Sequence, residues 1–222
     1  MLQVSRRSTI GESGPAETLA LRAHFDRHHW VRAPGMLEPE LLRDIQARLA
    51  RAEFVERIHT GVTPPSVDLC MVPNAAAALL ELAFNDPAVL RAIEQITGCH
   101  PLTRFGGFVY RLSPGYGHEH QWHNDLVEGR RVAMSVNLGP GTYEGGLLEL
   151  RDRASEEVLA RLPNTVPGDA LLFRIDAALQ HRATAVTAGV KTAFAGWYFT
   201  AESYADCLRR DQAHDGAKPP GE

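Results

Sequence analysis

Residues 118–125 read HEHQWHND and place three histidines and two acids within eight positions. The stretch is compatible with a β-strand, in which side chains at positions i and i+2 project to the same face. His123 and Asp125 are therefore expected to point the same way and to grip one metal ion. Because an isolated HxD pair is a very short motif, a metal site is predicted only if a distant residue supplies a third ligand.

The sequence around this stretch predicts the fold. From about Leu102 onward, short β-compatible segments such as RFGGFVYRLSPG, RRVAMSVNLG and GDALLFRI are separated by Gly, Pro, Asn or Asp. Six or more segments at this rhythm predict an antiparallel double-sheet barrel of the jelly-roll, cupin-like kind, a double-stranded β-helix. Since the first half reads as helical, we expect a mainly β protein with helices packed on one outer face.

Two segments of the first half carry helical signals. After LEPE, apolar residues follow helical spacing from Leu42 to Leu49. In NDPAVLRAIEQITG, Asp86 suits an N-cap, Pro87 the first helical position, and Gly98 the C-terminal end. Both apolar stripes are interpreted as core contacts without a functional role.

The length and composition of the 222-residue chain indicate its domain organisation, its location and the partners that it lacks. Residues 1–15 are expected to form a flexible N-terminal arm, 16–206 a single domain, and 207–222 a flexible C-terminal tail. A net charge of -4 argues against a nucleic-acid partner. Three widely spaced cysteines without a CxxC motif indicate a reducing compartment. With neither an apolar run of about 18 residues nor a signal-peptide pattern, no membrane association and a cytoplasmic location are expected.

The best candidate for the third ligand is His181, which opens the stretch HRATAVTAGVKTAFAGWYF. We interpret this stretch as a β-hairpin with a three-residue loop ending at Gly189, so that residue 181 pairs with residue 195. In that register His181 faces the same way as Lys191 and Trp197, with small alanines between them. A lysine directed into a barrel indicates an anionic partner, because burying an unpaired ammonium is costly.

Two histidines and one carboxylate with open coordination positions favour non-haem iron(II) over zinc or copper. In the expected hairpin, the position opposite Lys191 lies four residues from His181, which is roughly 13 Å at ~3.3 Å per residue. A five-carbon dicarboxylate that chelates the metal at one end spans about that gap. The spacing therefore suits a metal-bound dicarboxylic acid whose far carboxylate meets Lys191.

An ordered set of motifs between about Phe105 and Phe199 resembles the iron(II)/2-oxoglutarate-dependent oxygenases, in their prolyl-4-hydroxylase-like branch. PGYGHEHQWHND resembles the Pro-Gly strand leading into HxD, and RRVAMSVNL resembles the strand that follows. YEGGLLEL is similar to the Gly-Gly-x-Leu hairpin, and VPGDALLF to the strand before the distal histidine. The last hairpin carries the cosubstrate base ten residues after that histidine.

The resemblance implies the cofactor iron(II), the cosubstrate 2-oxoglutarate, and O2. It also implies hydroxylation of an unactivated C–H bond with release of succinate and CO2. The site residues that it implies are the iron ligands His123, Asp125 and His181, Lys191 on the C5 carboxylate of 2-oxoglutarate, Asn137 where relatives often place a tyrosine on the same carboxylate, and Trp197 in the pocket wall.

The expected substrate is an amino acid, a peptide side chain or a similar small metabolite. Arg130 resembles a position that contacts substrate in some relatives, and Arg111 is expected to face the barrel and meet an anion. His120 and Trp122 are candidates for the rim of the cavity. The run RIHTGVTPPSVDLCMVP, residues 57–73, is interpreted as a loop that serves either as a substrate lid or as a crossing connection.

Two other functions stay open. One is a metal-dependent cupin-type enzyme that does not use 2-oxoglutarate, in which Lys191 would bind the substrate instead. The other is a non-catalytic sensor module that keeps the metal-binding residues.

Overall fold

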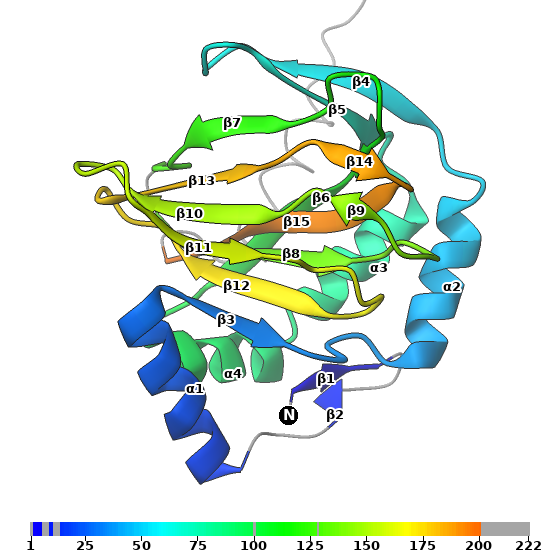
Figure 1. Cartoon of the computed structure of the whole chain (residues 1–222). Coiled ribbons are helices and arrows are strands. Elements are labelled where there is room, and N and C mark those ends of the chain that lie inside the picture. The colour runs from blue at the N-terminus through cyan, green and yellow to red at the C-terminus, as the bar shows by residue number, and fades with distance from the viewer. Residues whose placement is uncertain (1, 6–8, 11–13, 100, 128, 201–222) are drawn as a thin grey trace, which may run out of the picture.

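The computed structural model describes residues 2–5, 9–10, 14–99, 101–127 and 129–200. Two antiparallel sheets face each other in this part of the chain (Figure 1). The larger has the order β3-β12-β8-β15-β6-β5-β4, and the smaller the order β11-β10-β13-β7. The predicted jelly-roll core with helices against one sheet is confirmed.

The strands of the larger sheet are β3 (Trp30–Ala33), β4 (Phe54–His59), β5 (Ser66–Met71), β6 (Arg104–Leu112), β8 (Arg130–Asn137), β12 (Ala170–Arg174) and β15 (Lys191–Phe199). Those of the smaller sheet are β7 (His120–His123), β10 (Leu148–Asp152), β11 (Val158–Leu162) and β13 (Leu179–Ala183). Two separate ribbons pair β1 (Gln3–Val4) with β2 (Thr9–Ile10), and β9 (Glu144–Gly145) with β14 (Val186–Ala188).

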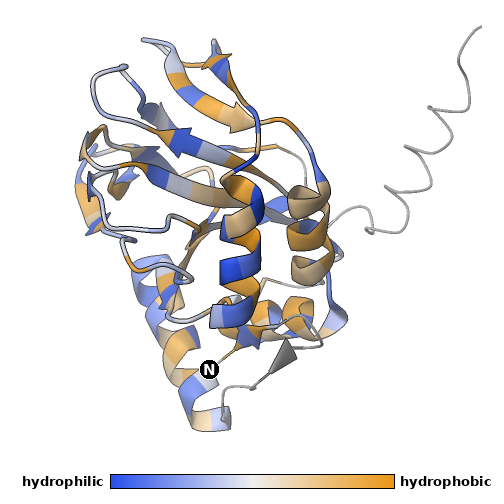
Figure 2. Cartoon of the chain, turned by 90° about the vertical axis from the view of Figure 1, so that its right-hand side faces the viewer, coloured by the Kyte–Doolittle hydropathy of each residue, from blue (hydrophilic) through white to orange (hydrophobic). Residues whose placement is uncertain are grey.

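The helices pack on the outer side of the larger sheet (Figure 1). They are α1 (Pro15–His28), α2 (Pro39–Leu49), α3 (Ala75–Phe84) and α4 (Pro87–Thr97). A continuous apolar core joins their buried side chains to the outward-facing residues of this sheet, which leaves the space between the two sheets free for a site. α2 faces the viewer in Figure 2, with hydrophobic residues alternating with hydrophilic ones along it.

The predicted helical signals are confirmed. The side chain of Asp86 accepts a hydrogen bond from the backbone N–H of Ala88, and Gly98 ends α4 in the left-handed conformation that glycine adopts without strain. In α2, Leu42, Ile45 and Leu49 are buried, as their spacing predicts.

The expected flexible arm, residues 1–15, is described only in part. Leu2 and Val4 are buried in the core beneath α1, and the Val4 N–H donates to the carbonyl of Met36. Burial of these apolar side chains stabilises this part of the segment against the core. Residues 201–206 and the tail expected at 207–222 lie outside the described residues.

The run 57–73 was interpreted as a loop, and this is corrected. Most of it belongs to an antiparallel hairpin of β4 and β5, in which Arg57 pairs with Asp68. β5 pairs in turn with β6, so the hairpin extends the larger sheet. Only residues 60–65 form a loop between the two strands.

The predicted final hairpin is wrong in its pairing. β13 and β15 lie in different sheets: His181 pairs with Leu150 and His123, whereas Ala195 pairs with strands β6 and β8. Gly189 does have the positive φ expected for the turn, but the short β14 before it pairs with β9. Turn chemistry is local, while the choice of partner strand depends on distant segments. Only the positive φ of Gly189 was therefore predicted correctly: the expected loop residues Thr187 and Ala188 lie in β14, and Val186 pairs with Gly145.

Glycine at position 196 allows the central strands to approach closely. Gly196 pairs with Gly107 of β6. A Cβ atom added at Gly196 would collide with the carbonyl oxygen of Gly106 and with Cα of Gly107. A residue without a side chain is therefore required in the middle of β15, next to the wall of the site.

Candidate active site

Three metal-ligating side chains converge at the inner face of the smaller sheet. His123 ends β7, and His181 lies directly across from it on β13, with their ring centroids 4.2 Å apart. Asp125 follows β7 by two residues. Each of the three offers a ligand atom, and these atoms all lie within 4.8 Å of one another. Two imidazoles and one carboxylate grouped in this way can hold a single divalent metal ion with positions left open.

Asp125 reaches the two histidines through a turn. β7 ends at His123, and Asp125 has a positive φ of 48°, so strand alternation does not bring the pair together as expected. The indole Nε1 of Trp197 donates to Asp125 Oδ2 at 2.8 Å, and His181 Nε2 lies 3.2 Å from the same oxygen. The Trp197 hydrogen bond therefore holds the carboxylate in place, while the backbone of Asp125 has a conformation that few non-glycine residues adopt.

The protonation states of these side chains suit a metal. The backbone carbonyl oxygen of Gln121 lies 2.6 Å from His123 Nδ1 and can accept a hydrogen bond from the Nδ1–H tautomer, which leaves Nε2 free to face the site. Burial and the neighbouring His181 lower the pKa of His123 to about 4. Burial alone would raise the pKa of Asp125, but interactions with His181, His123 and Trp197 outweigh it and lower this pKa. A neutral imidazole and an ionised carboxylate are the forms that bind metal.

The three side chains open into a cavity of about 670 Å³ between the sheets. Its wall is largely apolar and includes Phe108, Leu148 and Phe173. Lys191, on β15 of the opposite sheet, also borders this cavity and is only 4% exposed. The cavity is large enough for a cosubstrate and a small substrate together.

Lys191 carries a buried charge. Its ammonium donates to the carbonyl of Gly146 at 2.7 Å, and no carboxylate within the described ranges forms an ion pair with it. Burial lowers its pKa to about 8, so it remains mostly protonated at neutral pH. A dehydrated ammonium whose one acceptor among the described residues is a neutral carbonyl favours a bound anion.

Tyr110 is a cavity residue that sequence reasoning missed. It lines the cavity, and its ring centre lies 5.9 Å from Lys191 Nζ. Burial raises its pKa, so its hydroxyl keeps the proton. Asn137, the residue expected near this lysine, is buried but does not line the cavity: its Oδ1 accepts from the Gly139 N–H. The alternation of Phe108 and Tyr110 in FGGFVYRL was the available signal for an inward-facing tyrosine.

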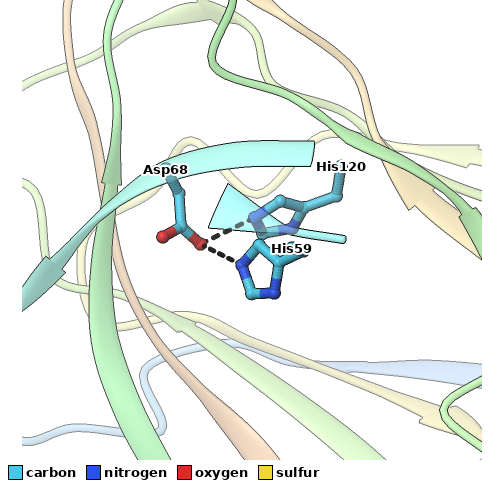
Figure 3. A group of neighbouring side chains, drawn as sticks. All are labelled: His59, Asp68 and His120. Atoms are coloured by element: carbon cyan, nitrogen blue, oxygen red, sulfur yellow. Dashed lines mark hydrogen bonds and ion pairs between the residues drawn. The ribbon is translucent and has the colours of Figure 1, made fainter. Parts of the chain in front are cut away.

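A second polar cluster borders the same cavity, because Arg57, His59 and His120 line it. Figure 3 shows His59 and His120 turned toward Asp68. Asp68 is fully buried, and its Oδ2 lies 3.2 Å from His59 Nε2 and 2.9 Å from His120 Nε2. Arg57 grips the same carboxylate with two hydrogen bonds, from Nε to Oδ1 at 3.0 Å and from Nη2 to Oδ2 at 2.6 Å. Of these four residues the sequence singled out only His120, because Asp68 and its other two partners lie in the run interpreted as a loop.

Comparison with known proteins shows which family this chain resembles. The profile of the 2OG-Fe(II) oxygenase superfamily matches residues 107–199, which contain the three ligand candidates and Lys191. A PKHD-type hydroxylase of Picosynechococcus sp. (strain ATCC 27264 / PCC 7002 / PR-6) is 29% identical over 176 residues, covering 76% of this chain and 77% of the relative. The chain is therefore similar to the 2OG-Fe(II) oxygenase superfamily, and both similarities support an oxygenase enzyme. The oxygenase therefore uses iron(II), 2-oxoglutarate and O2.

Solved structures share the fold of this oxygenase. A 2OG-Fe(II) oxygenase family oxidoreductase from Burkholderia pseudomallei matches with a TM-score of 0.65 and 16% identity, covering 91% of this chain and 98% of that one. A prolyl-4-hydroxylase from Pseudomonas putida matches with a TM-score of 0.62 and 17% identity, covering 83% and 99%. Within the described residues, no helix has the length and apolar character needed to cross a membrane.

The residues expected to bind substrate divide into two groups. In this oxygenase Arg130 and His120 line the cavity. Arg130 stacks on the Trp197 ring, with its Cζ 3.6 Å from the ring centre, and its Nη1 lies 3.7 Å from Asp125 Oδ1. Both side chains are therefore placed where a substrate can reach them.

Arg111 and Trp122 do not line the cavity, and their expected positions are corrected. The Arg111 guanidinium stacks on Phe54 and donates to the carbonyl of Leu49 at 3.2 Å, on the helical side of the larger sheet. Trp122 lies between the guanidinium groups of Arg151 and Arg182, 4.5 and 4.7 Å from its ring centre. Strand alternation explains both, because Arg111 follows the inward-facing Tyr110 and Trp122 precedes the inward-facing His123.

Proposed function

We propose that this oxygenase is a hydroxylase that acts on an unactivated C–H bond of an amino acid, a peptide side chain or a similar small metabolite, with release of succinate and CO2. One observation carries the proposal: the buried ammonium of Lys191, which has no carboxylate partner in the described part of the chain, shares a cavity with three converging metal-ligating side chains. The similarity to a PKHD-type hydroxylase supports hydroxylation as the outcome.

His123, Asp125 and His181 are the residues that we assign as the iron ligands. The donor set fits iron(II), because it combines two imidazoles with one carboxylate and has a cavity on its open side. When bound, iron(II) and 2-oxoglutarate supply the oxidising chemistry, in which O2 is reduced, the cosubstrate loses CO2, and one oxygen atom is transferred to the substrate carbon. The protein contributes position and the exclusion of water, with Trp197 holding the aspartate by its indole N–H.

Lys191 and Tyr110 are the residues that we assign to the far carboxylate of 2-oxoglutarate. Lys191 supplies a positive charge, and the adjacent Tyr110 keeps its phenolic proton, which makes its hydroxyl a possible donor. Asn137 remains a prediction for the same role: its Nδ2 is buried and has no hydrogen-bond partner within the described residues. It pairs with Ala193, two residues from Lys191 on β15.

Substrate is proposed to enter beside Arg130 and His120. Both line the cavity together with the exposed loop residues Thr60 and Leu126. Arg130 has a buried Nε without a partner in the described chain, and burial lowers its pKa. An additional acceptor from a substrate would satisfy this group.

The test uses the full-length protein loaded with iron(II). Under anaerobic conditions, addition of 2-oxoglutarate is expected to produce a weak visible charge-transfer band. After admission of O2, slow release of succinate is expected even without prime substrate. Absence of both signals in iron-loaded protein contradicts the proposal and favours a cupin-type enzyme that does not use 2-oxoglutarate. A charge-transfer band without release of succinate, whichever candidate substrate is added, favours a non-catalytic sensor.

A further inference from the structure

The cluster around Asp68 resembles a metal site but lacks the electrostatics of one. Ligand atoms of His59, Asp68 and His120 lie within 4.8 Å of one another. However, the Arg57 guanidinium makes two hydrogen bonds to the same carboxylate and already neutralises it. A divalent ion bound there would lie next to this fixed positive charge, which makes its binding unfavourable. Asp68 is better understood as the anchor that holds three cationic or neutral side chains in place.

Arg57 keeps hydrogen-bonding capacity toward the cavity. Its Nε and Nη2 are used by Asp68, while Nη1 makes no hydrogen bond to any described residue. The guanidinium stacks on Phe108, with Cζ 3.9 Å above the ring centre, and both residues line the cavity. A guanidinium held on two sides in this way loses little further freedom when it binds a carboxylate.

The charges of the cavity leave one positive charge unbalanced. Arg57, Arg130 and Lys191 line it, and their charges are opposed by the two carboxylates of Asp125 and Asp68. Iron(II) and the 2-oxoglutarate dianion cancel each other when both are bound. Arg182 also borders the cavity, but its guanidinium is bonded to Glu149 outside it. The loaded site is therefore expected to attract one further anionic group.

We propose that Arg57, oriented by Asp68 and flanked by His59, binds a carboxylate of the substrate, so that the substrate class of this oxygenase is a carboxylic acid. The inference rests on the proposed function of the cavity. Arg57 is more accessible than the lysine assigned to 2-oxoglutarate, since its side chain is 28% exposed and Lys191 is 4% exposed. The exposed loop residues Thr60 and Gly61, close to it in the chain, border the same cavity. Substrate and cosubstrate carboxylates thus have separate cationic partners.

The experiment measures binding and needs no turnover. Full-length protein is loaded with Mn(II) and N-oxalylglycine, an inert isostere of 2-oxoglutarate, and titrated with ¹³C-labelled acetate as the probe. Acetate is expected to show saturable, Mn(II)-dependent relaxation enhancement, and neutral acetamide is expected to show none. Arg57→Gln should weaken acetate binding by about tenfold or more, the effect of losing a charge-assisted hydrogen bond. Arg151→Gln, which alters a guanidinium on Trp122 outside the cavity, is the matched control.

Each outcome has a defined meaning. No saturable acetate signal, or one that Arg57→Gln leaves unchanged, overturns the inference, the latter because the anion then binds elsewhere in the cavity. The inference is also overturned if the unsubstituted protein binds a second equivalent of Mn(II) and the His59→Ala variant does not, because the cluster around Asp68 would then hold a metal. Failure of N-oxalylglycine to change the water relaxation of Mn(II)-loaded protein counts against the proposed function instead. Folding of each variant is checked by its unfolding midpoint, and Arg57→Lys, which keeps the charge, should retain part of the acetate signal.

Discussion

His123 and His181 are direct cross-strand partners on β7 and β13, although 58 positions separate them in the chain. Cross-strand partners have their side chains on the same face, so the pairing itself brings both imidazoles to one point. Asp125 then needs only a turn to reach them. The smaller sheet and the turn after β7 thus bring the three ligand candidates together.

Removing one of these ligands is predicted to abolish metal binding. His181→Ala or Asp125→Ala should lower Mn(II) affinity by more than about a hundredfold, because loss of an outer hydrogen-bond partner alone costs about 10–100-fold. Isothermal titration in the absence of O2 measures this directly. Asp176→Ala, which removes a carboxylate that caps an exposed turn, should leave the affinity unchanged. Normal Mn(II) affinity in His181→Ala would show that the metal binds elsewhere.

Trp197→Phe tests the hydrogen bond to Asp125 with the ring retained. Without the indole N–H, Asp125 Oδ2 loses a donor at 2.8 Å, and we expect Mn(II) affinity to fall about tenfold. A matched Trp30→Phe substitution, in a tryptophan on edge strand β3, should not change it. An equal effect in both variants would point to general loss of packing.

Lys191→Met is predicted to separate cosubstrate binding from metal binding. It removes the charge and keeps the length of the side chain, so the Kd of 2-oxoglutarate should rise by about a hundredfold or more while the affinity for Mn(II) is unchanged. Lys191→Arg should restore part of the affinity. The Kd is obtained from the charge-transfer band under anaerobic conditions, and an unchanged Kd would remove Lys191 from the cosubstrate site.

The same lysine predicts how cosubstrate binding depends on pH. Its pKa in the free protein is about 8, below the ordinary value because of burial, and a bound dianion favours its charged form and raises that pKa. The affinity for 2-oxoglutarate should therefore be constant below about pH 7. Above pH 8 it should fall by up to tenfold per unit, because a proton must then be taken up on binding. Titrations from pH 6 to 9 check this, and Lys191→Arg should give a flat profile.

Gly196→Ala is predicted to destabilise the fold. The added methyl group collides with the backbone of β6 at Gly106 and Gly107, and overpacking of this kind costs typically about 1–3 kcal/mol in the free energy of unfolding. Gly141→Ala is the matched control, since a Cβ there has no neighbour within 4 Å among the described atoms. Urea denaturation of both variants measures the difference.

The sequence predicted what depends on local pattern. Capping at Asp86, the stripe of α2 and the positive φ of Gly189 all follow from nearby residues, and the structure has each of them. The metal-ligand candidates were found because HxD and a later histidine are recognisable without knowing their partner strands. Pairing was not predictable in this way: β13 and β15 were assigned to one hairpin, and they lie in opposite sheets.

The Asp68 cluster shows the same limit. Arg57, His59 and Asp68 lie on two short strands with mixed polarity, and polar residues at inward-facing positions read as a loop. Their arrangement makes sense only once β5 is paired with β6 beside the cavity. The period of two across Arg57 and His59 was a local sign of a strand.

The passage of the chain from β13 to β15 has a mechanical consequence. His123 and His181 belong to the smaller sheet and Lys191 to the larger. A cosubstrate that binds the metal at one end and Lys191 at the other would therefore link the two sheets. Without the bound molecule, the two sheets should open locally more often. The rate of amide hydrogen exchange along β7 should therefore report whether metal and cosubstrate are bound.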